Sequence, residues 1–541
     1  MRQRIRSALP CQKLASAPAS TIVLRKQRQS NRAYLMDQEQ FIESFDEYQQ
    51  QRYEKLLALR DNQIEPYPID SERTHDSRAA VALMDGVAEG EEGPEVAVAG
   101  RIVAIRKMGK ASFLHIEDRS GRIQLYLRKD EVGEESYARF KAALDLGDII
   151  SAAGPLFRTR TGEVTVRVTG WSLLAKALNQ PPDKHHGLTD TEQRYRERYV
   201  DLLANDEIRE LFITRSRITS LVRRFLEDRG FIEVETPVLQ SLYGGAAAKA
   251  FTTHHEWAKR DLYLRISLEL HLKRLIVGGL ERVFEIGRNF RNEGLSWKHN
   301  PEFTMLEAYQ AYADFRDMME LLESCWVSVA QALNGRLTLD FDGHTIDLAP
   351  PWPRHTMRNL VLSESGIDLY EAHTLPLLRA AIAAQGLRID PQPTWGKLVD
   401  ELFSTVVEPK LIQPTFVMEY PYELSPFAKQ LPDNPNFVER FEMFVGGMEV
   451  ANAFSELNDP LEQLERFLDQ QRQREAGDEE TTPIDLDFIN ALMYGMPPTG
   501  GIGWGMDRMA MLFTGQRNIR EVILFPTLRA TPTDGTATPN S

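Results

Sequence analysis

Hydrophobic and polar positions follow two different periods along the first part of the chain. Between residues 38 and 62, apolar side chains recur at near-helical spacing among Glu, Gln, Arg and Lys, which predicts an amphipathic helix. Short β-branched or aromatic runs bounded by Gly or charged turns come next. They predict strands at 96–105, 112–117, 122–127, 148–157 and 163–168.

Five short strands in so compact a stretch favour a small barrel of the oligonucleotide-binding (OB) kind. The block at 206–529 instead mixes helical stretches, such as 206–229 and 266–279, with strand-like runs. These runs lie at 282–286, 415–420 and 442–445. Strands separated by helices of irregular length predict an α+β domain with a largely antiparallel sheet.

A length of 541 residues leads one to expect two or three domains, and composition shifts divide the chain into six segments. They are a basic leader (1–36), an N-terminal helical extension (37–95), the barrel (96–175), a linker (176–205), the α+β domain (206–529) and a disordered tail (530–541). A mostly helical insertion is predicted near 316–410.

Charge and cysteine content exclude some classes of protein. A net charge of −15 argues against sequence-blind coating of nucleic acid, although a local basic patch could still hold RNA. No apolar run is long enough to cross a membrane. Cys11 and Cys325 are far apart and lack partners at ligand spacing, so we expect neither a disulfide framework nor zinc.

The first 36 residues hold eight Lys or Arg and no Asp or Glu, and two interpretations compete. The composition is typical of a transit peptide, which would place the protein in an organelle. A disordered or mis-assigned leader, with the working start at Met36, would leave the protein in the cytoplasm. We favour the second interpretation and a cytoplasmic location.

Three stretches of the 206–529 block stand out, and two of them could carry chemistry. Phe290-Arg291-Asn292-Glu293 precedes 299–304, and an Arg and a Glu two apart on a strand would share a face. A guanidinium there can bind phosphate or carboxylate through two N–H groups, although a lone Arg-x-Glu is more often a surface ion pair. The glycine-rich stretch 501–505 places Arg508 on a following helix but lacks the dinucleotide fingerprint, because position 506 is Met.

The third stretch, 230–237, reads as a structural corner in which a helix ends and a strand stops at Pro237. In this order and at these distances, the three stretches resemble motifs 1, 2 and 3 of class II aminoacyl-tRNA synthetases. Further stretches resemble the class II lysyl-tRNA synthetases specifically, at 108–113, 182–184, 269–275, 299–304 and 452–459. The resemblance covers roughly residues 38–529.

This resemblance implies a Mg²⁺-dependent enzyme that activates L-lysine with ATP and transfers it to tRNA(Lys). It also implies a homodimer built through motif 1, in which Pro237 matches an interface position. Arg291 and Arg508 would be catalytic, holding the α- and γ-phosphates. The implied ATP-binding residues are Arg291, Glu293, His299, Asn300, Phe303, Glu442 and Arg508, and the implied metal ligands are Glu442 and Glu449.

Substrate recognition is implied at two further places. The implied lysine-binding residues are Gly245, Glu269, Glu307, Tyr309, Asn452, Phe454 and Glu456, and the implied anticodon-binding residues are Phe113, Gln124 and Glu163. A buried ammonium needs a partner, and Glu456 is the candidate for the ε-ammonium. An exposed aromatic ring such as Phe113 can stack on an unpaired base, although local sequence alone would place it in the core.

Three alternatives remain. The sister synthetases for aspartate and asparagine would need a cationic pocket, against which the glutamates argue. Protein-lysylating relatives lack the barrel and carry Ala at the position of Gly503. A non-catalytic derivative could have lost Arg291 or Arg508, yet both are present. Departures from the family pattern at 246–250, Met448 and Trp504 leave the shape of the pocket open.

Overall fold

The computed structural model describes residues 37–88, 90–182, 188–475 and 481–529. These residues form two compact units, and the boundary between the units lies between residues 187 and 188 of the chain. The predictions for 1–36 and 530–541 lie outside the described residues. Within the described part of the chain, no helix is both long and apolar enough to cross a membrane.

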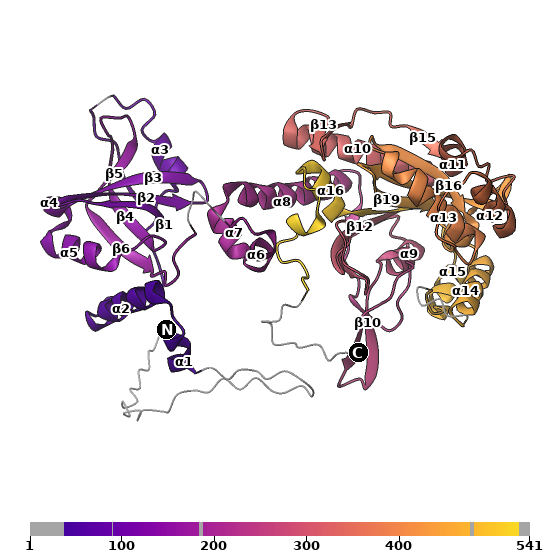
Figure 1. The fold of residues 1–541 in the computed structure, drawn as a ribbon, viewed down its shortest axis with the longest axis horizontal. Coiled ribbons are helices and arrows are strands. Elements are labelled where there is room, and N and C mark those ends of the chain that lie inside the picture. The colour runs from indigo at the N-terminus through magenta and orange to yellow at the C-terminus, as the bar shows by residue number, and fades with distance from the viewer. Residues whose placement is uncertain (1–36, 89, 183–187, 476–480, 530–541) are drawn as a thin grey trace, which may run out of the picture. The chain divides into compact units, whose positions relative to one another are not determined.

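The first unit is built on a closed barrel of five strands (Figure 1). They are β1 (Glu95–Lys107), β2 (Ala111–Asp118), β3 (Gly121–Arg128), β4 (Ile149–Arg158) and β5 (Val164–Val168). The order is β1-β2-β3-β5-β4, and β1 pairs again with β4, which removes the open edges of the sheet. The five strands predicted from the sequence are thus present, and a sixth, β6 (Gly170–Ala175), was missed; it pairs with β4.

The barrel core follows the alternation of side chains along each strand. On β2, Leu114 and Ile116 are fully buried, whereas Phe113 and His115, which alternate with them, are only partly covered. Three further helices belong to this unit, α3 (Ser77–Ala82), α4 (Lys129–Val132) and α5 (Glu134–Ala143). Ala80 of α3 joins the barrel core.

The single helix predicted at 38–62 is wrong, because the segment forms two helices, α1 (Gln38–Glu43) and α2 (Glu47–Asp61). The break lies at Asp46, whose carboxylate accepts a hydrogen bond from the backbone N–H of Gln49 at 2.8 Å. The Gln49 side chain accepts from the Asp46 N–H in return, which completes a capping box. A local capping signal therefore overrides the longer hydrophobic period.

The second unit begins with two short helices, α6 (Thr191–Arg196) and α7 (Arg198–Ala204), within the range predicted as a linker. The buried Arg198 guanidinium binds Asp201 at 2.6 Å and donates to the backbone carbonyl of Leu524 at 3.1 Å. The Tyr195 hydroxyl donates to Glu521, on the short helix η3 (Ile519–Glu521), at 2.7 Å. These contacts attach α6 and α7 to the C-terminal end of the same unit.

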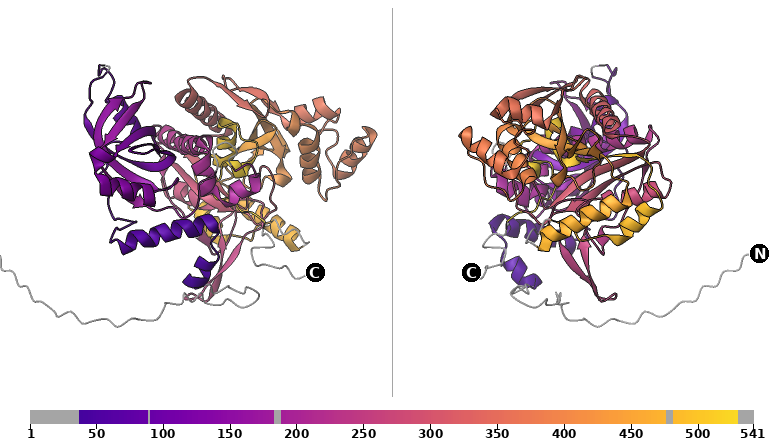
Figure 2. Two further views of the ribbon diagram at one scale, coloured as in Figure 1. Left: turned by 60° about the vertical axis from the view of Figure 1, so that its left-hand side comes forward. Right: turned by 90° about the vertical axis from the view of Figure 1, so that its right-hand side faces the viewer.

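A large mixed sheet forms the centre of this unit (Figure 2). Its order is β15-β16-β18-β19-β20-β12-β11-β7, with β17 added to β18. The strands are β7 (Ile232–Glu233), β11 (Arg282–Phe290), β12 (Glu302–Ala311), β15 (Arg354–Thr356), β16 (Thr415–Pro421), β17 (Gln430–Leu431), β18 (Asn434–Val445), β19 (Met448–Ser455) and β20 (Thr499–Gly505). Among the strands that the structure describes in this sheet, only the β7–β11 and β15–β16 pairs are parallel, which confirms a largely antiparallel sheet.

Helices cover both faces of this sheet. The largest core cluster joins α8 (Asp206–Glu227), α10 (Phe315–Asn334) and α16 (Met506–Phe513) to the sheet through residues such as Trp326 and Trp504. A second cluster joins α9 (Glu269–Val277), α14 (Pro460–Glu475) and α15 (Leu486–Met493) to β12. Two small sheets are formed by β8 (Leu239–Gln240), β9 (Thr252–His255) and β10 (Arg260–Leu264), and by β13 (Thr338–Phe341) with β14 (His344–Asp347).

The range 316–410, predicted as a mostly helical insertion, has a mixed structure. Helix α10 packs in the main core, and the β13–β14 hairpin and β15 follow it. The rest is helical and forms a core cluster of its own with β16 and β18. It comprises α11 (Met357–Ser365), α12 (Leu375–Ala384), α13 (Trp395–Val406) and η1 (Glu408–Lys410), and the short helix η2 (Tyr422–Leu424) follows β16.

Candidate active site

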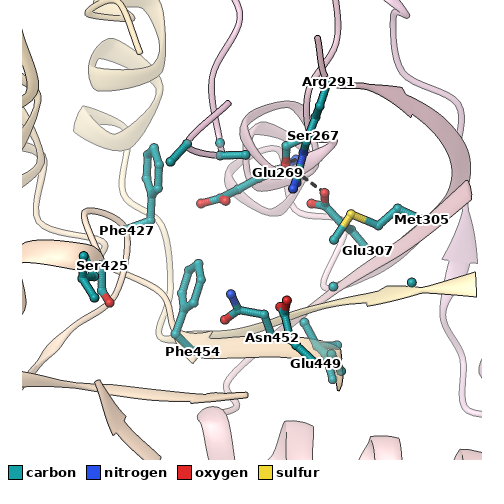
Figure 3. A pocket seen from close by; sticks show the side chains of 18 of the residues that line it. Ser267, Glu269, Arg291, Met305, Glu307, Ser425, Phe427, Glu449, Asn452 and Phe454 are labelled. Atoms are coloured by element: carbon teal, nitrogen blue, oxygen red, sulfur yellow. Dashed lines mark hydrogen bonds between the residues drawn. The ribbon is translucent and has the colours of Figure 1, made fainter. Parts of the chain in front are cut away.

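A cavity of about 410 Å³ in the second unit is lined by almost all of the residues predicted to bind ATP or lysine (Figure 3). Strands β12, β19 and β20 provide its floor, and the loop after β11 and the start of α9 provide its walls. Glu442 is the one predicted ligand in this unit that is absent from the lining. The tertiary fold thus brings together side chains that are up to 263 positions apart, from Gly245 to Arg508.

Strand β20 explains why glycine is needed beside the cavity. Its alternate residues Ile502 and Trp504 point into the main core, so Gly501 and Gly503 face the opposite side. A Cβ on Gly501 would lie 1.8 Å from Glu456 Oε1 and 2.5 Å from the Tyr309 ring. Gly501 therefore leaves the space that these two side chains fill, and Trp504 is not among the residues that line the cavity.

Three glutamates of the cavity are buried. Glu269 begins α9, Glu307 lies on β12 and Glu456 directly follows β19. Oε1 of Glu307 accepts hydrogen bonds from Ser267 Oγ at 2.8 Å and from the Leu268 N–H at 3.0 Å. Burial, together with the charge of Glu269, raises the pKa of Glu307 to about 7. Negative charge is therefore concentrated where the sequence predicted recognition of ammonium groups.

One residue that the sequence analysis missed holds two of these glutamates. Lys273 is completely buried; its Nζ lies 2.5 Å from Glu269 Oε1 and forms an ion pair with Glu456 Oε2. The aromatic rings of Phe427 and Phe454 lie 4.9 and 5.4 Å from the ammonium. The sequence did contain a signal, because Lys273 stands four positions after Glu269 on a predicted helix.

Three arginines also line the cavity, and two of them, Arg291 and Arg508, are the predicted catalytic pair. Arg291 follows β11, so the expectation that it lies on a strand with Glu293 is wrong; the pairing with β12 ends at Phe290. Its Nε donates to the Ile266 carbonyl at 3.4 Å, and its guanidinium lies 5.2 Å from the Phe303 ring. Burial lowers the pKa of Arg291, and no described carboxylate is paired with it.

The second arginine, Arg508, lies on α16 as predicted. Its Nη1 donates to the Glu449 carbonyl at 2.5 Å and lies 3.2 Å from Glu449 Oε2. His299 lies nearby and accepts or donates a hydrogen bond with Ser296 Oγ at 2.9 Å. Burial, with the charge of Arg508, lowers the pKa of His299 to about 4, so His299 is neutral at physiological pH.

Glu293 and Asn300 complete the predicted ATP-binding set in the cavity. Asn300 Nδ2 donates to the Glu302 carbonyl at 2.5 Å. Its Oδ1 is buried and finds no hydrogen-bond donor among the described residues. This oxygen is therefore available to a ligand.

Glu442 is held by the protein itself. Arg440 Nη2 donates to its Oε1 at 2.6 Å and the Tyr420 hydroxyl donates to its Oε2 at 2.9 Å. Asn452, which faces the cavity, accepts from Arg440 Nε at 3.1 Å. Burial and the charge of Glu449 raise the pKa of Glu442 to about 8. In the described parts of the chain, no three His, Cys, Asp or Glu side chains cluster as a metal site.

The three predicted anticodon residues lie in the barrel unit. Gln124 Nε2 donates to Glu163 Oε2 at 2.8 Å, and Phe113 stacks on Tyr126 with ring centroids 4.6 Å apart. His115, which the sequence analysis missed, binds Glu163 Oε1 at 2.8 Å. Its position two residues after Phe113 on one strand puts both side chains on the same face.

Comparison with known proteins agrees with this architecture. The family model of class II tRNA synthetases (D, K and N) matches residues 190–529, and that of the OB-fold nucleic acid binding domain matches residues 96–174. The lysine–tRNA ligase of Roseiflexus sp. is 55% identical over 89% of this chain and 99% of its own length. Those of Pelotomaculum thermopropionicum and Chloroflexus aurantiacus are 52% and 51% identical over 90% and 89% of this chain, and 96% and 98% of their own lengths.

The chain belongs to the class II lysyl-tRNA synthetases. This confirms the family and the fold class predicted from the sequence, an OB barrel followed by a class II synthetase domain. In this synthetase the cavity of the second unit is the candidate active site, and the barrel carries the candidate tRNA-binding surface.

The buried Glu307 makes the stability of this synthetase depend on pH. Its pKa rises from 4.5 to about 7 on folding, so between these values the unfolded chain releases a proton that the folded chain keeps. Stability therefore falls as pH rises through this window. Residue 307 cannot titrate in the Glu307→Gln variant. The free energy of unfolding of the variant, relative to that of the wild type, should therefore increase by up to about 3 kcal/mol between pH 4.5 and 8. Urea unfolding at both pH values tests this, and a constant difference would contradict it.

Proposed function

We propose that this protein is a lysine–tRNA ligase, which activates L-lysine with ATP to lysyl-adenylate and pyrophosphate and transfers the lysyl group to the 3′ end of tRNA(Lys). The observation that carries the proposal is the cluster of three buried glutamates beside two arginines in one cavity. Lysine brings two ammonium groups for the glutamates and one carboxylate for an arginine. The relatives named above carry the name of this activity.

Electrostatic stabilisation and positioning account for the activation step. The carboxylate of lysine attacks the α-phosphorus of ATP, so negative charge accumulates on the phosphate oxygens. Arg291, with no carboxylate partner among the described residues, holds the substrate carboxylate and the α-phosphate. Arg508 holds the γ-phosphate, and Phe303 stacks on the adenine ring. Glu293, His299 and Asn300 complete the ATP subsite.

The glutamates set the choice of amino acid. Glu456 accepts the ε-ammonium, with Tyr309 and Glu307 beside it, and Glu269 with Gly245 takes the α-ammonium. Asn452 and Phe454 complete the lining. Aspartate or asparagine would place an acidic or neutral side chain against these carboxylates, which a buried negative cluster disfavours.

Magnesium is a proposed companion of ATP. Glu449 is 36% exposed in the side chain and lines the cavity beside Arg508, so it fits as a metal ligand. Both oxygens of Glu442 already accept hydrogen bonds, but burial and, after it, repulsion from Glu449 raise its pKa, and a divalent cation would relieve that repulsion. Because two carboxylates are too few for the six oxygens that Mg²⁺ prefers, the phosphates of ATP and water must supply the rest.

ATP–pyrophosphate exchange with purified protein and Mg²⁺ tests the proposed function. The panel is lysine, ornithine, arginine, aspartate and asparagine. Exchange with lysine alone supports the proposal, after which charging of tRNA(Lys) is measured. Exchange with aspartate or asparagine, or with none of the five, would refute it.

Glu456→Gln should abolish lysine activation. The substitution keeps the shape of the side chain but removes the charge that pairs with the ε-ammonium, a loss on the order of 10⁴-fold for sites of this kind. Lysine-dependent pyrophosphate exchange measures it. Glu462→Gln, on the nearby α14 and with a side chain 34% exposed, is a matched control. Near-normal exchange by Glu456→Gln would refute the assignment.

The barrel is proposed to read the anticodon. Phe113 offers an aromatic face to a base, while Gln124 and Glu163, joined by a hydrogen bond, read base edges. Phe113→Ala should therefore lower kcat/KM for tRNA charging by roughly 10- to 100-fold, the range for loss of one stacked base. Lysine-dependent pyrophosphate exchange should stay nearly unchanged. Equal loss in both assays would mean that Phe113 only supports the fold.

A homodimer through motif 1 is also proposed. Strand β7 is the edge of the main sheet, and Ile232 on it is 49% exposed. Leu239 and Leu242, a few residues beyond Pro237, are 47% and 44% exposed. An unpaired edge with several exposed apolar side chains favours burial against a partner, here a second copy of the chain.

The combined change Ile232→Asp and Leu239→Asp should convert a dimer to monomers, because it places charge in the proposed interface. Light scattering after size exclusion measures the mass. Leu461→Asp, at a leucine on α14 that is 75% exposed, is the control and should leave the dimer intact. A wild-type monomer, or an unaltered dimer in the double variant, would contradict the prediction.

We also propose a cytoplasmic location. The organellar alternative depends on residues 1–36, which lie outside the described residues.

A further inference from the structure

Lys273 is a charged side chain in a place where charge is costly. None of its side chain is exposed, and three aromatic rings surround its ammonium, those of Phe427, Phe454 and Phe488. A buried ion pair is a poor way to stabilise a fold, because an apolar replacement of similar volume is often at least as stable. The aromatic surroundings would suit such a replacement. The presence of Lys273 at this position therefore needs an explanation based on the ligand that the cavity binds.

The charges around the cavity supply an explanation for the buried Lys273. Glu269, Glu307 and Glu456 bring three negative charges, and Lys273 and Arg291 bring two positive ones. The net charge of this group is one negative, and free lysine carries one net positive charge. With Lys273 in place, these five side chains, when all are ionised, and the bound amino acid together carry no net charge.

The positions of the oxygen atoms are equally specific. Lys273 binds Oε1 of Glu269 and Oε2 of Glu456. Oε1 of Glu456 is buried, has no hydrogen-bond donor among the described residues, and lies on the side of Gly501 and Tyr309. Lys273 thus occupies one oxygen of Glu456 and leaves the other for an incoming ammonium.

We propose that Lys273 is a positioning residue that holds Glu269 and Glu456 ionised and fixed, and so matches the cavity to an amino acid of net charge +1. The inference rests on the proposed function, because it assumes that lysine is the ligand. Lys273 itself would not contact the reacting atoms. It would act through Glu456 and Glu269.

The other groups that face this pair cannot take over the role. On β12, the Tyr309 hydroxyl donates to Glu307 at 3.0 Å, and Glu307 adds a further negative charge. On β18, Arg440 is committed to Glu442 and Asn452. Burial raises the pKa of Glu456 and of Glu269, and Lys273 opposes both shifts. Removal of Lys273 would therefore raise the pKa of both carboxyl groups further.

The test is the pH dependence of the KM for lysine in pyrophosphate exchange with Lys273→Met in the full-length protein. In this variant, the carboxyl groups of Glu269 and Glu456 must ionise without a counter-ion. Binding of the substrate lysine should therefore weaken about tenfold for each unit by which their pKa exceeds the pH. We expect the KM to rise on the order of 10- to 100-fold at pH 7 and to recover towards pH 9. The KM for ATP should change little.

Lys176→Met is the matched control. Lys176 is also fully buried and binds two carboxylates, Asp145 at 2.7 Å and Asp148 at 2.8 Å, but it lies in the barrel unit. This variant should keep the wild-type KM for lysine at every pH. A Lys273→Met variant whose KM is unchanged, or is raised equally at all pH values, would overturn the inference.

A second variant separates charge from packing. Lys273→Ala leaves a space in which n-propylammonium restores the charge and n-propanol, of the same size, restores only volume. Recovery of lysine-dependent exchange with n-propylammonium alone supports the inference, and equal recovery with both would overturn it. Absence of exchange in the wild type would instead refute the proposed function, so the two failures are distinguishable.

Discussion

The burial of three carboxylates on one face of a central sheet is the constraint on which the site depends. Each of them needs a partner, because an unpaired buried charge costs several kcal/mol. Glu307 obtains one from a hydroxyl and a backbone N–H at the start of α9, and Lys273 serves Glu269 and Glu456. The buried carboxylates can therefore bind a ligand that carries two ammonium groups.

The sheet can hold this charge because its two faces have different tasks. Along β20, Ile502 and Trp504 pack into the largest core cluster. Gly501 and Gly503, which alternate with them, lie on the other face and line the cavity. Rigid packing on one side fixes the strands that carry Glu307 and Glu456 on the other. The accuracy of the pocket therefore derives from the core behind it.

The barrel, in a separate unit, also has strands with one face in the core and one face outside it. Strand β2 buries Leu114 and Ile116, and Phe113 and His115, which alternate with them, lie on its other face. Its polar surface group is linked by hydrogen bonds through Glu163. Each unit has a core of its own, so a substitution in one core need not disturb the packing of the other.

The sequence by itself determined the elements and the kinds of residue at the site. Period and turn signals placed the five barrel strands and the helix at 206–229, and motif order identified the arginines, because these are local properties of the chain. Local signals also caused errors, since the cap at Asp46 divides a helix and β11 ends before Arg291. Only the tertiary structure decided the pairing of charges. Lys273 is four residues from Glu269 but 183 from Glu456, and no periodicity reveals that a third element brings Glu456 to the same ammonium. Such contacts depend on how strands and helices pack, which the sequence does not show position by position.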